Sequence, residues 1–422
     1  MKRFLFLSFL LVITACTKRE PVFFQSGSFF EPPKAEQPSQ PASTVSVLLP
    51  LSGESAEVGQ SLQKAALLSL FEHKSTPMKL LFFDTQSSGE GAKQAYDWAL
   101  AQKPDVVIGP VFSSEVAAIK EHGISRPLLT FTSDTTVIRD DVASMAVLIP
   151  DQIQKLVSYA CEKGQHRLAV LGPEDKTGEI AMNALSDAVK TCPGMRLSHV
   201  SLYDKNTMNF TPAVLKIIPK VIRDRGNLTP EEKELANTPM KSRISFDALF
   251  VFESGIKLRQ LASLLNFYEI NPRQVPTYGL ASVKQVKDKN ANGIIFADVE
   301  DAGYTHFSQN YKRQFGKQPV RLASLIYDAL NMAFERTEMG NLSMDDLRRT
   351  PYQGIDGLIQ LQPDGTNRRA LQIVKKAGNY NVLIQAADMA DAYNEVSGAT
   401  IESDDLALVS PGELDEYQDS FE

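Results

Sequence analysis

Residues 45–70, VSVLLPLSGESAEVGQSLQKAALLSL, decide the fold that this chain can adopt. Residues 45–49 form a continuous apolar run, which is typical of a strand buried on both faces of a parallel sheet. Pro50 and Gly53 end the strand, and the apolar residues that follow recur at helical spacing. The stretch therefore predicts the first half of a βαβ unit. Because ligands bind at the carboxyl ends of strands in open α/β sheets, residues 51–59 are the first candidate binding segment.

Strand-like and helical segments alternate over most of the chain. In a first lobe we expect strands at residues 45–49, 78–84, 105–109 and 127–131, and helices at 59–70, 91–102 and 113–121. In a second lobe we expect strands at residues 167–171, 196–202, 248–252, 276–279 and 293–297, and helices at 152–162, 178–191, 213–223 and 257–268. This alternation predicts an α/β protein with two lobes, each a mostly parallel sheet covered by helices.

The later part of the chain returns to both lobes. Two long amphipathic helices are expected at residues 301–315 and 322–339, and a closing β-meander at 355–361, 370–376 and 380–384. We therefore expect lobe 1 to contain residues 45–148 and 300–345, and lobe 2 to contain residues 149–299 and 346–385. A charged interruption at 223–243 contains Thr229, Pro230 and Glu232 in the pattern that begins a surface helix.

Composition narrows the class of protein. The chain has 422 residues, of which 43% are hydrophobic, so it is long enough for two domains. Its net charge is −7 and its pI is near 5.5. Nucleic acid demands a basic face, so this charge argues against a nucleic-acid partner.

The amino terminus predicts export. Lys2 and Arg3 precede an apolar run that is too short to span a bilayer, as in a secretory signal. The tetrapeptide Ile-Thr-Ala-Cys that ends at Cys16 resembles the lipobox of bacterial lipoproteins. This resemblance implies that residues 1–16 comprise the signal peptide and the acylated cysteine, with the signal removed immediately before Cys16. An ordinary signal peptide is the alternative. Because Thr17, and not Asp, follows the cysteine, the resemblance implies the periplasmic face of the outer membrane.

Two further segments lie outside the predicted folded part. Residues 17–44 contain five prolines with several Ser and Gln residues, a composition typical of an extended tether. Residues 386–422 contain eleven acidic residues and no Lys or Arg, so we expect a disordered acidic tail.

Cys161 and Cys192 remain besides Cys16. In an exported chain such a pair predicts a disulfide, and two buried free thiols are the alternative. No motif of the common covalent, phosphate-binding or zinc-dependent enzymes occurs, and the five histidines are dispersed. We therefore predict that the protein is not an enzyme and has no cofactor and no metal site.

The order of elements resembles a known family of receptors. The segments VLLPLSG (47–53), DVVIGPVFSSEV (105–116), YDAL (327–330) and GIDGLIQLQPDG (354–365) look like the type I periplasmic binding fold of branched-chain amino-acid receptors. Residues 246–283 resemble more narrowly the carboxyl-terminal domain of LpoA-like lipoprotein activators of penicillin-binding proteins.

The resemblance implies a cleft between the lobes and names candidate ligand-binding residues. Hydroxyl groups after the third and fourth strands hold the ligand in the amino-acid receptors, and further side chains can reach the cleft from elsewhere. By position these residues are Ser113, Ser114, Thr132, Ser133, Glu253, Tyr278 and Tyr327. The structural alternatives are that Ser113 and Ser114 cap a helix and that Tyr278 and Tyr327 pack at an interface.

Two functions follow from the resemblance. The first is a non-catalytic lipoprotein that activates a class A penicillin-binding protein, which is a peptidoglycan synthase. The alternative is the substrate-binding lipoprotein of an amino-acid-type ABC transporter. Convergent hydroxyls and a carboxylate in the cleft would favour a small-molecule ligand, and a cleft plugged by apolar side chains would favour the activator.

Overall fold

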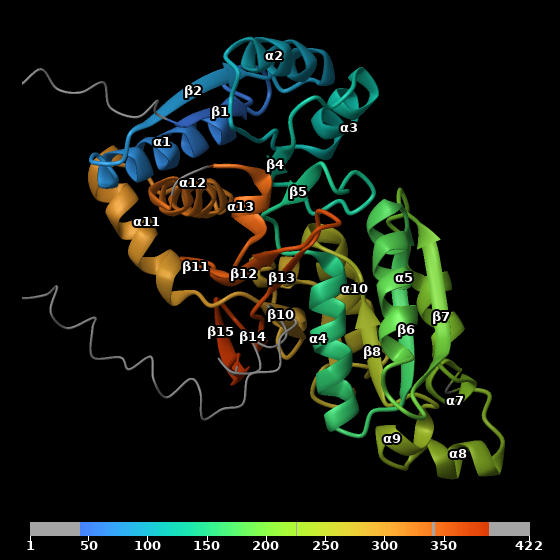
Figure 1. The fold of residues 1–422 in the computed structure, drawn as a ribbon. Helices are drawn as coiled ribbons and strands as arrows, with labels where there is room; N and C mark the ends of the chain where they lie inside the picture. The colour runs from blue at the N-terminus through green and yellow to red at the C-terminus, as the bar shows by residue number, and fades with distance from the viewer. Residues whose placement is uncertain (1–42, 225, 340–341, 388–422) are drawn as a thin grey trace, which may run out of the picture. The chain divides into compact units, whose positions relative to one another are not determined.

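The structure is a computed structural model that describes residues 43–387, except residues 225, 340 and 341. Two main sheets and one small sheet organise these residues (Figure 1). The predicted signal, Cys16, residues 17–42 of the tether and all but the first two residues of the acidic tail lie outside the described residues. The last two residues of the predicted tether, Ser43 and Thr44, instead begin β1. Within the described ranges, no helix has the length and apolar character that crossing a membrane requires.

The first sheet has five parallel strands in the order β2-β1-β3-β4-β5. Its strands are β1 (Ser43–Leu49), β2 (Met78–Asp84), β3 (Val106–Ile108), β4 (Leu128–Thr130) and β5 (Val142–Ser144). The strands are apolar on both faces because helices cover both. One face packs on α1 (Ala56–Glu72), α11 (Ala302–Phe315) and α12 (Ala323–Glu338), and the other on α2 (Gly89–Ala101) and α3 (Ser113–His122).

The second sheet has seven strands in the order β15-β14-β10-β9-β8-β6-β7. They are β6 (Arg167–Glu174), β7 (Arg196–Asp204), β8 (Ala248–Val251), β9 (Thr277–Gly279), β10 (Ile295–Asp298), β14 (Gln372–Ala377) and β15 (Tyr380–Gln385). The strands from β7 to β10 are parallel, whereas β14 and β15 are antiparallel. Helices α4 (Ile149–Glu162) and α5 (Lys176–Val189) cover one face, and α6 (Thr211–Ile217) and α10 (Gly255–Phe267) cover the other.

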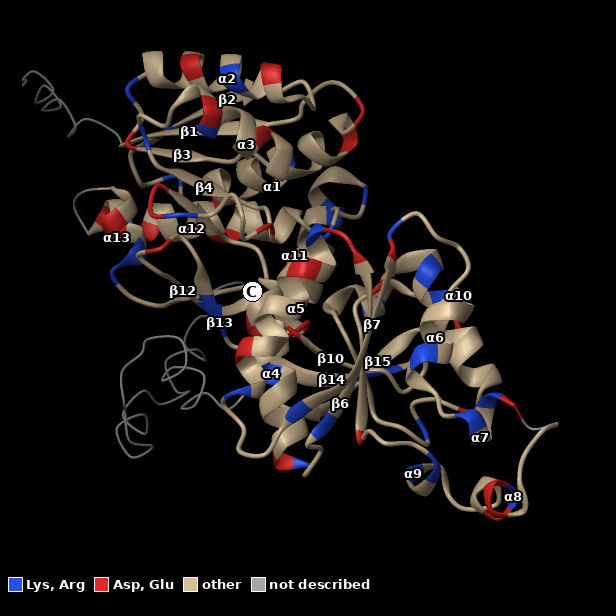
Figure 2. Ribbon diagram, turned by 90° about the vertical axis from the view of Figure 1, so that its right-hand side faces the viewer, with Lys and Arg blue, Asp and Glu red and all other residues tan. Residues whose placement is uncertain are grey.

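The charged interruption forms short helices, namely α7 (Lys220–Arg223), α8 (Pro230–Ala236) and α9 (Met240–Arg243). Helix α8 begins as predicted, because the Thr229 hydroxyl accepts a hydrogen bond from the Glu232 backbone N–H at 3.2 Å. No residue of α8 is buried, and this segment carries both acidic and basic residues (Figure 2). Between β9 and β10 the chain forms two 3₁₀ helices, η1 (Ala281–Gln285) and η2 (Lys289–Ala291).

The predicted closing β-meander is wrong as one unit. The chain instead forms a small antiparallel sheet of β11 (Tyr352–Gly354), β12 (Gly357–Leu361) and β13 (Asn367–Arg369), and then adds β14 and β15 to the second sheet. The small sheet and α13 (Met344–Arg348) pack on α12 in the first core, because Ile359 and Leu361 are buried there. Residues 346–361 therefore belong with the first sheet, and not with lobe 2 as expected.

A disulfide joins Cys161, in the last turn of α4, to Cys192, which follows α5. The Cα atoms are 6.1 Å apart, and the residues are separated by 31 positions. These two helices lie side by side on one face of the second sheet, which is the arrangement that the pairing requires. Closing a loop of this length stabilises a folded chain by about 3 to 4 kcal/mol through the unfolded state.

Candidate functional site

The candidate site is a cleft where the carboxyl ends of strands from both main sheets meet. It consists of a first compartment of about 300 Å³ and a second of about 480 Å³. The two compartments share five lining residues and are therefore parts of one cleft. The shared residues are Ser133, Val147, Gln152, Ala281 and Ser282. Ser133 follows β4 of the first sheet and Ala281 follows β9 of the second, so the cleft lies between the lobes.

The first compartment is acidic and rich in hydroxyl groups. Thr177 and Ser254 contribute hydroxyls, and Asp175 and Glu253 contribute carboxylates. One Asp175 oxygen accepts a hydrogen bond from the Gly178 N–H at 2.9 Å and so caps α5. Among the described residues that line this compartment, none is Lys or Arg.

Glu253 is held in place by two hydrogen bonds. The Tyr203 hydroxyl donates to its Oε2 at 3.0 Å, and the Ser254 N–H donates to its Oε1 at 3.1 Å. Burial and the neighbouring Glu253 carboxylate raise the pKa of Tyr203, so this hydroxyl stays protonated and donates. The carboxylate is therefore oriented before any ligand arrives.

The second compartment has an apolar wall and a charged floor. Phe131, Leu322 and Leu325 supply much of the wall. On the floor, the Lys284 ammonium lies 2.9 Å from Asp298 and 2.5 Å from Asp301. Burial outweighs the attraction of Lys284 and raises the pKa of Asp298.

Arg321 is the second cation of this floor. Its Nη2 donates to Asp356 Oδ1 at 2.7 Å and its Nη1 donates to Oδ2 at 3.1 Å, while Nη1 also donates to the Ser324 hydroxyl at 2.5 Å. The guanidinium stacks on the Tyr304 ring at 4.3 Å. Asp356 is fully buried, and the Ser324 hydroxyl donates to it at 2.6 Å, so the ion pair is fixed from both sides.

One ion pair joins the lobes close to the cleft. Lys176, the first residue of α5, lies 2.7 Å from the carboxylate of Asp134 in the first lobe. Burial alone would raise the pKa of Asp134, but hydrogen bonds from Lys176 and Thr136 outweigh it and lower that pKa. The contact stays ionic at neutral pH.

The structure places two of the predicted site residues in the cleft and five elsewhere. Ser133 and Glu253 line it. Thr132 is nearly buried, and its hydroxyl accepts a hydrogen bond from the Asp134 N–H at 3.1 Å. Ser113 and Ser114 are the first residues of α3 and line neither compartment.

Each of the two tyrosines packs within the core of its own lobe. Tyr278 is fully buried and donates to Gln165 Oε1 at 2.7 Å. Tyr327 packs on Phe307 and donates to Glu72. Neither lines the cleft, because β9 points the first into the core and α12 points the second toward α1 and α11.

Sequence reasoning missed the charged residues of the second compartment. Asp298 ends a strand, and that position was a usable signal. Lys284, Arg321 and Asp356 lie in a 3₁₀ helix, a connection and a turn, where no periodicity marks them. Within the described ranges, no group of three or more His, Cys, Asp or Glu residues is placed to hold a metal ion.

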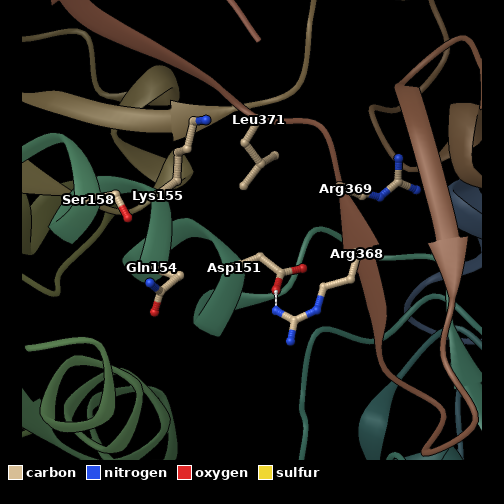
Figure 3. Close-up of a pocket in the computed structure, with 7 residues that line it drawn as sticks. All are labelled: Asp151, Gln154, Lys155, Ser158, Arg368, Arg369 and Leu371. Carbon is tan, nitrogen blue, oxygen red and sulfur yellow. Dashed lines mark hydrogen bonds and ion pairs between the residues drawn. The ribbon is translucent and has the colours of Figure 1, made fainter. Parts of the chain in front are cut away.

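A smaller cavity of about 220 Å³ lies outside the cleft and shares none of its lining residues (Figure 3). Arg368 closes one side and pairs with Asp151 at 3.1 Å. The Arg369 side chain points away from the other labelled groups, because it donates to the backbone oxygens of Met145 and Asp356 at 2.6 and 3.2 Å. Arg369 therefore links the end of β13 to the passage after β5 and to the turn between β11 and β12.

Comparisons with known proteins found a matching family profile and a similar protein. Residues 43–220 match the sequence profile of a family described as "Periplasmic binding protein". An uncharacterized protein of Rickettsia prowazekii is 21% identical over 342 residues, which are 79% of this chain and 86% of that protein.

Two solved structures illustrate the likeness. A branched-chain amino acid ABC transporter periplasmic ligand-binding protein from Burkholderia xenovorans has a TM-score of 0.64 at 15% identity, over 85% of this chain and 98% of that one. A branched-chain amino acid transporter substrate-binding protein from Streptococcus pneumoniae, in complex with isoleucine, has a TM-score of 0.54 at 16% identity, over 82% and 99%.

These findings confirm the predicted fold class. The chain has the α/β architecture of type I periplasmic binding proteins, with parallel sheets flanked by helices. This is the fold of solute-binding proteins. The narrower likeness to LpoA-like activators has no counterpart among these matches and stays a prediction.

Proposed function

We propose that this chain is a non-catalytic solute-binding protein whose interlobe cleft binds a small molecule with an amino group. The observation that carries the proposal is the open first compartment, in which two carboxylates and the hydroxyls of Thr177 and Ser254 from the second lobe face the Ser133 hydroxyl of the first. Fold alone does not transmit function, so the lining of this cleft supplies the argument.

The charge of the first compartment supports an amine. Asp175 and Glu253 line it without any Lys or Arg among the described lining residues. An ammonium group would gain charge-assisted hydrogen bonds there, whereas a carboxylate alone would meet like charge. The apolar side chains of Val147, Ile149 and Phe252 leave room for an aliphatic part of the same ligand.

The cleft favours solute binding over the activator function that the sequence analysis ranked first. Apolar side chains do not plug it, since the two compartments hold about 300 and 480 Å³ of free volume. The two solved structures compared above are named as transporter ligand- or substrate-binding proteins. Activation of a class A penicillin-binding protein stays a prediction, and co-purification from crosslinked envelope tests it, because a synthase and a permease cannot be confused.

The location of the protein is part of the proposal and rests on sequence. The lipobox-like ending at Cys16 supports acylation, and two or three acyl chains anchor a protein durably. We propose a lipid-anchored protein on the periplasmic face of the outer membrane. Mass spectrometry of the mature protein would check this, and an amino terminus at any other residue would contradict it.

A calorimetric panel tests the proposed ligand class. Leucine, 4-methylpentanoate and 3-methylbutylamine share an aliphatic part but differ in carrying both charges, the carboxylate alone or the ammonium alone. We expect binding that requires the ammonium group, and Glu253→Gln should weaken it at least about tenfold.

Glu121→Gln is the matched control, because Glu121 is an exposed residue of α3 that lines neither compartment. This variant should bind as the wild type does. Binding of 4-methylpentanoate as tightly as of the amines would refute the proposed class. If the protein bound no compound of an envelope metabolite library, the proposed solute-binding function itself would be refuted.

A further inference from the structure

The two compartments of the cleft carry opposite recognition groups. Glu253 lines only the first compartment, and Arg321 lines only the second. Five shared residues, including Ser133 and Ser282, lie between them along the cleft. A single α-amino acid carries its ammonium and carboxylate on one carbon atom, whereas a ligand that contacts both side chains has to extend through both compartments.

Arg321 presents a vacant hydrogen-bonding edge. Of its five N–H donors, three are used, because one Nη2 and both Nη1 hydrogens go to Asp356 and Ser324. The Nε hydrogen and the second Nη2 hydrogen have no hydrogen-bond acceptor among the described residues. These two donors are parallel, and such a fork matches the two oxygens of a carboxylate.

The guanidinium is accessible and held in position. Its side chain keeps 36% exposure while the paired Asp356 carboxylate keeps none. Asp356 fixes one edge and the Tyr304 ring supports one face, so little side-chain freedom would be lost on binding. Lys284 adds a second cation to the same compartment.

Part of the wall of the second compartment is apolar. Phe131 and Leu325 are buried residues of the first core that also line the second compartment, and Leu322 packs beside them. A ligand that spans the cleft would place an apolar side chain against this wall.

We propose that the natural ligand is a short hydrophobic peptide of at least two residues. Its terminal ammonium binds Glu253 in the first compartment, and its terminal carboxylate binds the free edge of Arg321 in the second. This inference rests on the proposed solute-binding function and narrows the ligand from an amine to a peptide.

The test compares four ligands on the wild-type protein by calorimetry. These are leucine, leucyl-leucine, leucyl-leucine amide and N-acetyl-leucyl-leucine. We expect leucyl-leucine to bind at least tenfold more tightly than leucine. Each of the two blocked peptides should bind at least tenfold more weakly than leucyl-leucine. Equal affinities of leucine and leucyl-leucine, or of the acid and its amide, would overturn the proposal.

Two variants localise the effect. Arg321→Lys keeps a positive charge but loses the pair of parallel N–H donors. The difference in affinity between leucyl-leucine and leucyl-leucine amide should therefore become smaller. Because Arg321 also supports the buried Asp356, Gln285→Trp provides an independent test: Gln285 is exposed and lines only the second compartment. Gln285→Trp should weaken the binding of leucyl-leucine and leave the binding of leucine unchanged. Gln274→Trp, at an exposed position outside the cleft, should change neither affinity.

The outcomes separate this inference from the proposed function. If leucine or another single amine binds and the peptide binds no more tightly, the solute-binding function is supported and the peptide proposal is refuted. Failure of every amine and every peptide removes both. A tryptophan at position 285 that weakened leucine and leucyl-leucine equally would also contradict the assignment of the two ends.

Discussion

Asp328 shows how burial sets the chemistry of a single residue. It lies on α12 at 1% exposure, and its two oxygens accept hydrogen bonds from the Ile355 and Asp356 N–H groups at 2.9 and 3.2 Å. Burial, and then the neighbouring Asp356 carboxylate, raise its pKa to about 7. The folded protein therefore binds this proton more tightly than the unfolded chain does.

The sign of the pH dependence follows from that shift. Because the folded-state pKa is raised from 3.8 to about 7, the stabilising effect of the bound proton is fully present below the unfolded value and is lost as the pH rises through about 7. Between pH 5 and 7.5 this group should reduce the free energy of unfolding by about 2 kcal/mol. Asp328→Asn should be less sensitive to pH over that range, as measured by urea unfolding.

Asp345→Asn serves as the control, because the Asp345 side chain is 96% exposed. Its stability should follow the pH as the wild type does. Wild-type and Asp328→Asn proteins whose stabilities changed in parallel with pH would contradict the assigned pKa.

At the scale of single residues, two of the residues that the resemblance implied line the cleft. Ser133 was named from its position after the fourth strand, and Glu253 as a residue able to reach the cleft from elsewhere. Arg321 could not be found, because its role depends on Asp356, 35 positions away, and on a fold that brings both to one cleft. Tyr278 and Tyr327 line neither compartment, and a sequence does not give the direction of a side chain on a packed element.

The turn between β12 and β13 shows how one element is fitted to another. Gly365 adopts a φ of +83°, and its carbonyl accepts a hydrogen bond from the Ser144 N–H at 3.0 Å. A Cβ atom there would lie 2.0 Å from the Arg139 oxygen and 2.4 Å from the Val142 oxygen. The turn can therefore dock on β5 only with glycine at this position.

Replacement of this glycine should release the turn from β5. Gly365→Ala should lower the free energy of unfolding by about 3 kcal/mol or more, because the positive φ and the backbone clash both oppose alanine. Gly378→Ala is the matched control: its φ is +67°, but nothing lies within 4 Å of its Cβ position, so it should cost only about 1 kcal/mol. Equal losses in the two variants, measured by chemical unfolding, would contradict the close contact.

At the scale of elements, local patterns predicted the helices and strands better than their partners. The strand at 78–84 and the capping of α8 were confirmed, because apolar runs and capping residues act over a few positions. The closing meander was wrong because strand pairing is decided between distant segments. β14 pairs with β10 across some 75 residues of chain, and β12 instead stays with the first core.

For the whole molecule, the two lobes were predictable from the repeated alternation and from the resemblance. The crossings expected at residues 148–149 and 299–300 fall where the chain passes between the sheets after β5 and after β10. The crossing expected at 345–346 differs, because the chain passes to the second sheet only after β13. The passages after β5 and after β13 meet at Arg369, which ends β13 and donates to the Met145 oxygen, and the ion pair between Lys176 and Asp134 joins the lobes beside the cleft. The cleft is thus a property of the assembled lobes, and its lining carries the functional conclusion.

The most direct test of that conclusion is native mass spectrometry of the full chain, purified and incubated with a small-molecule extract of the cell envelope. We predict a non-covalent adduct of one small molecule on the wild type that is absent from Ser282→Trp, because Ser282 lines both compartments of the cleft. Ser158→Trp fills the outer cavity instead and should keep the adduct. A wild-type protein that bound nothing, or an adduct that persisted in Ser282→Trp, would contradict a ligand-binding cleft.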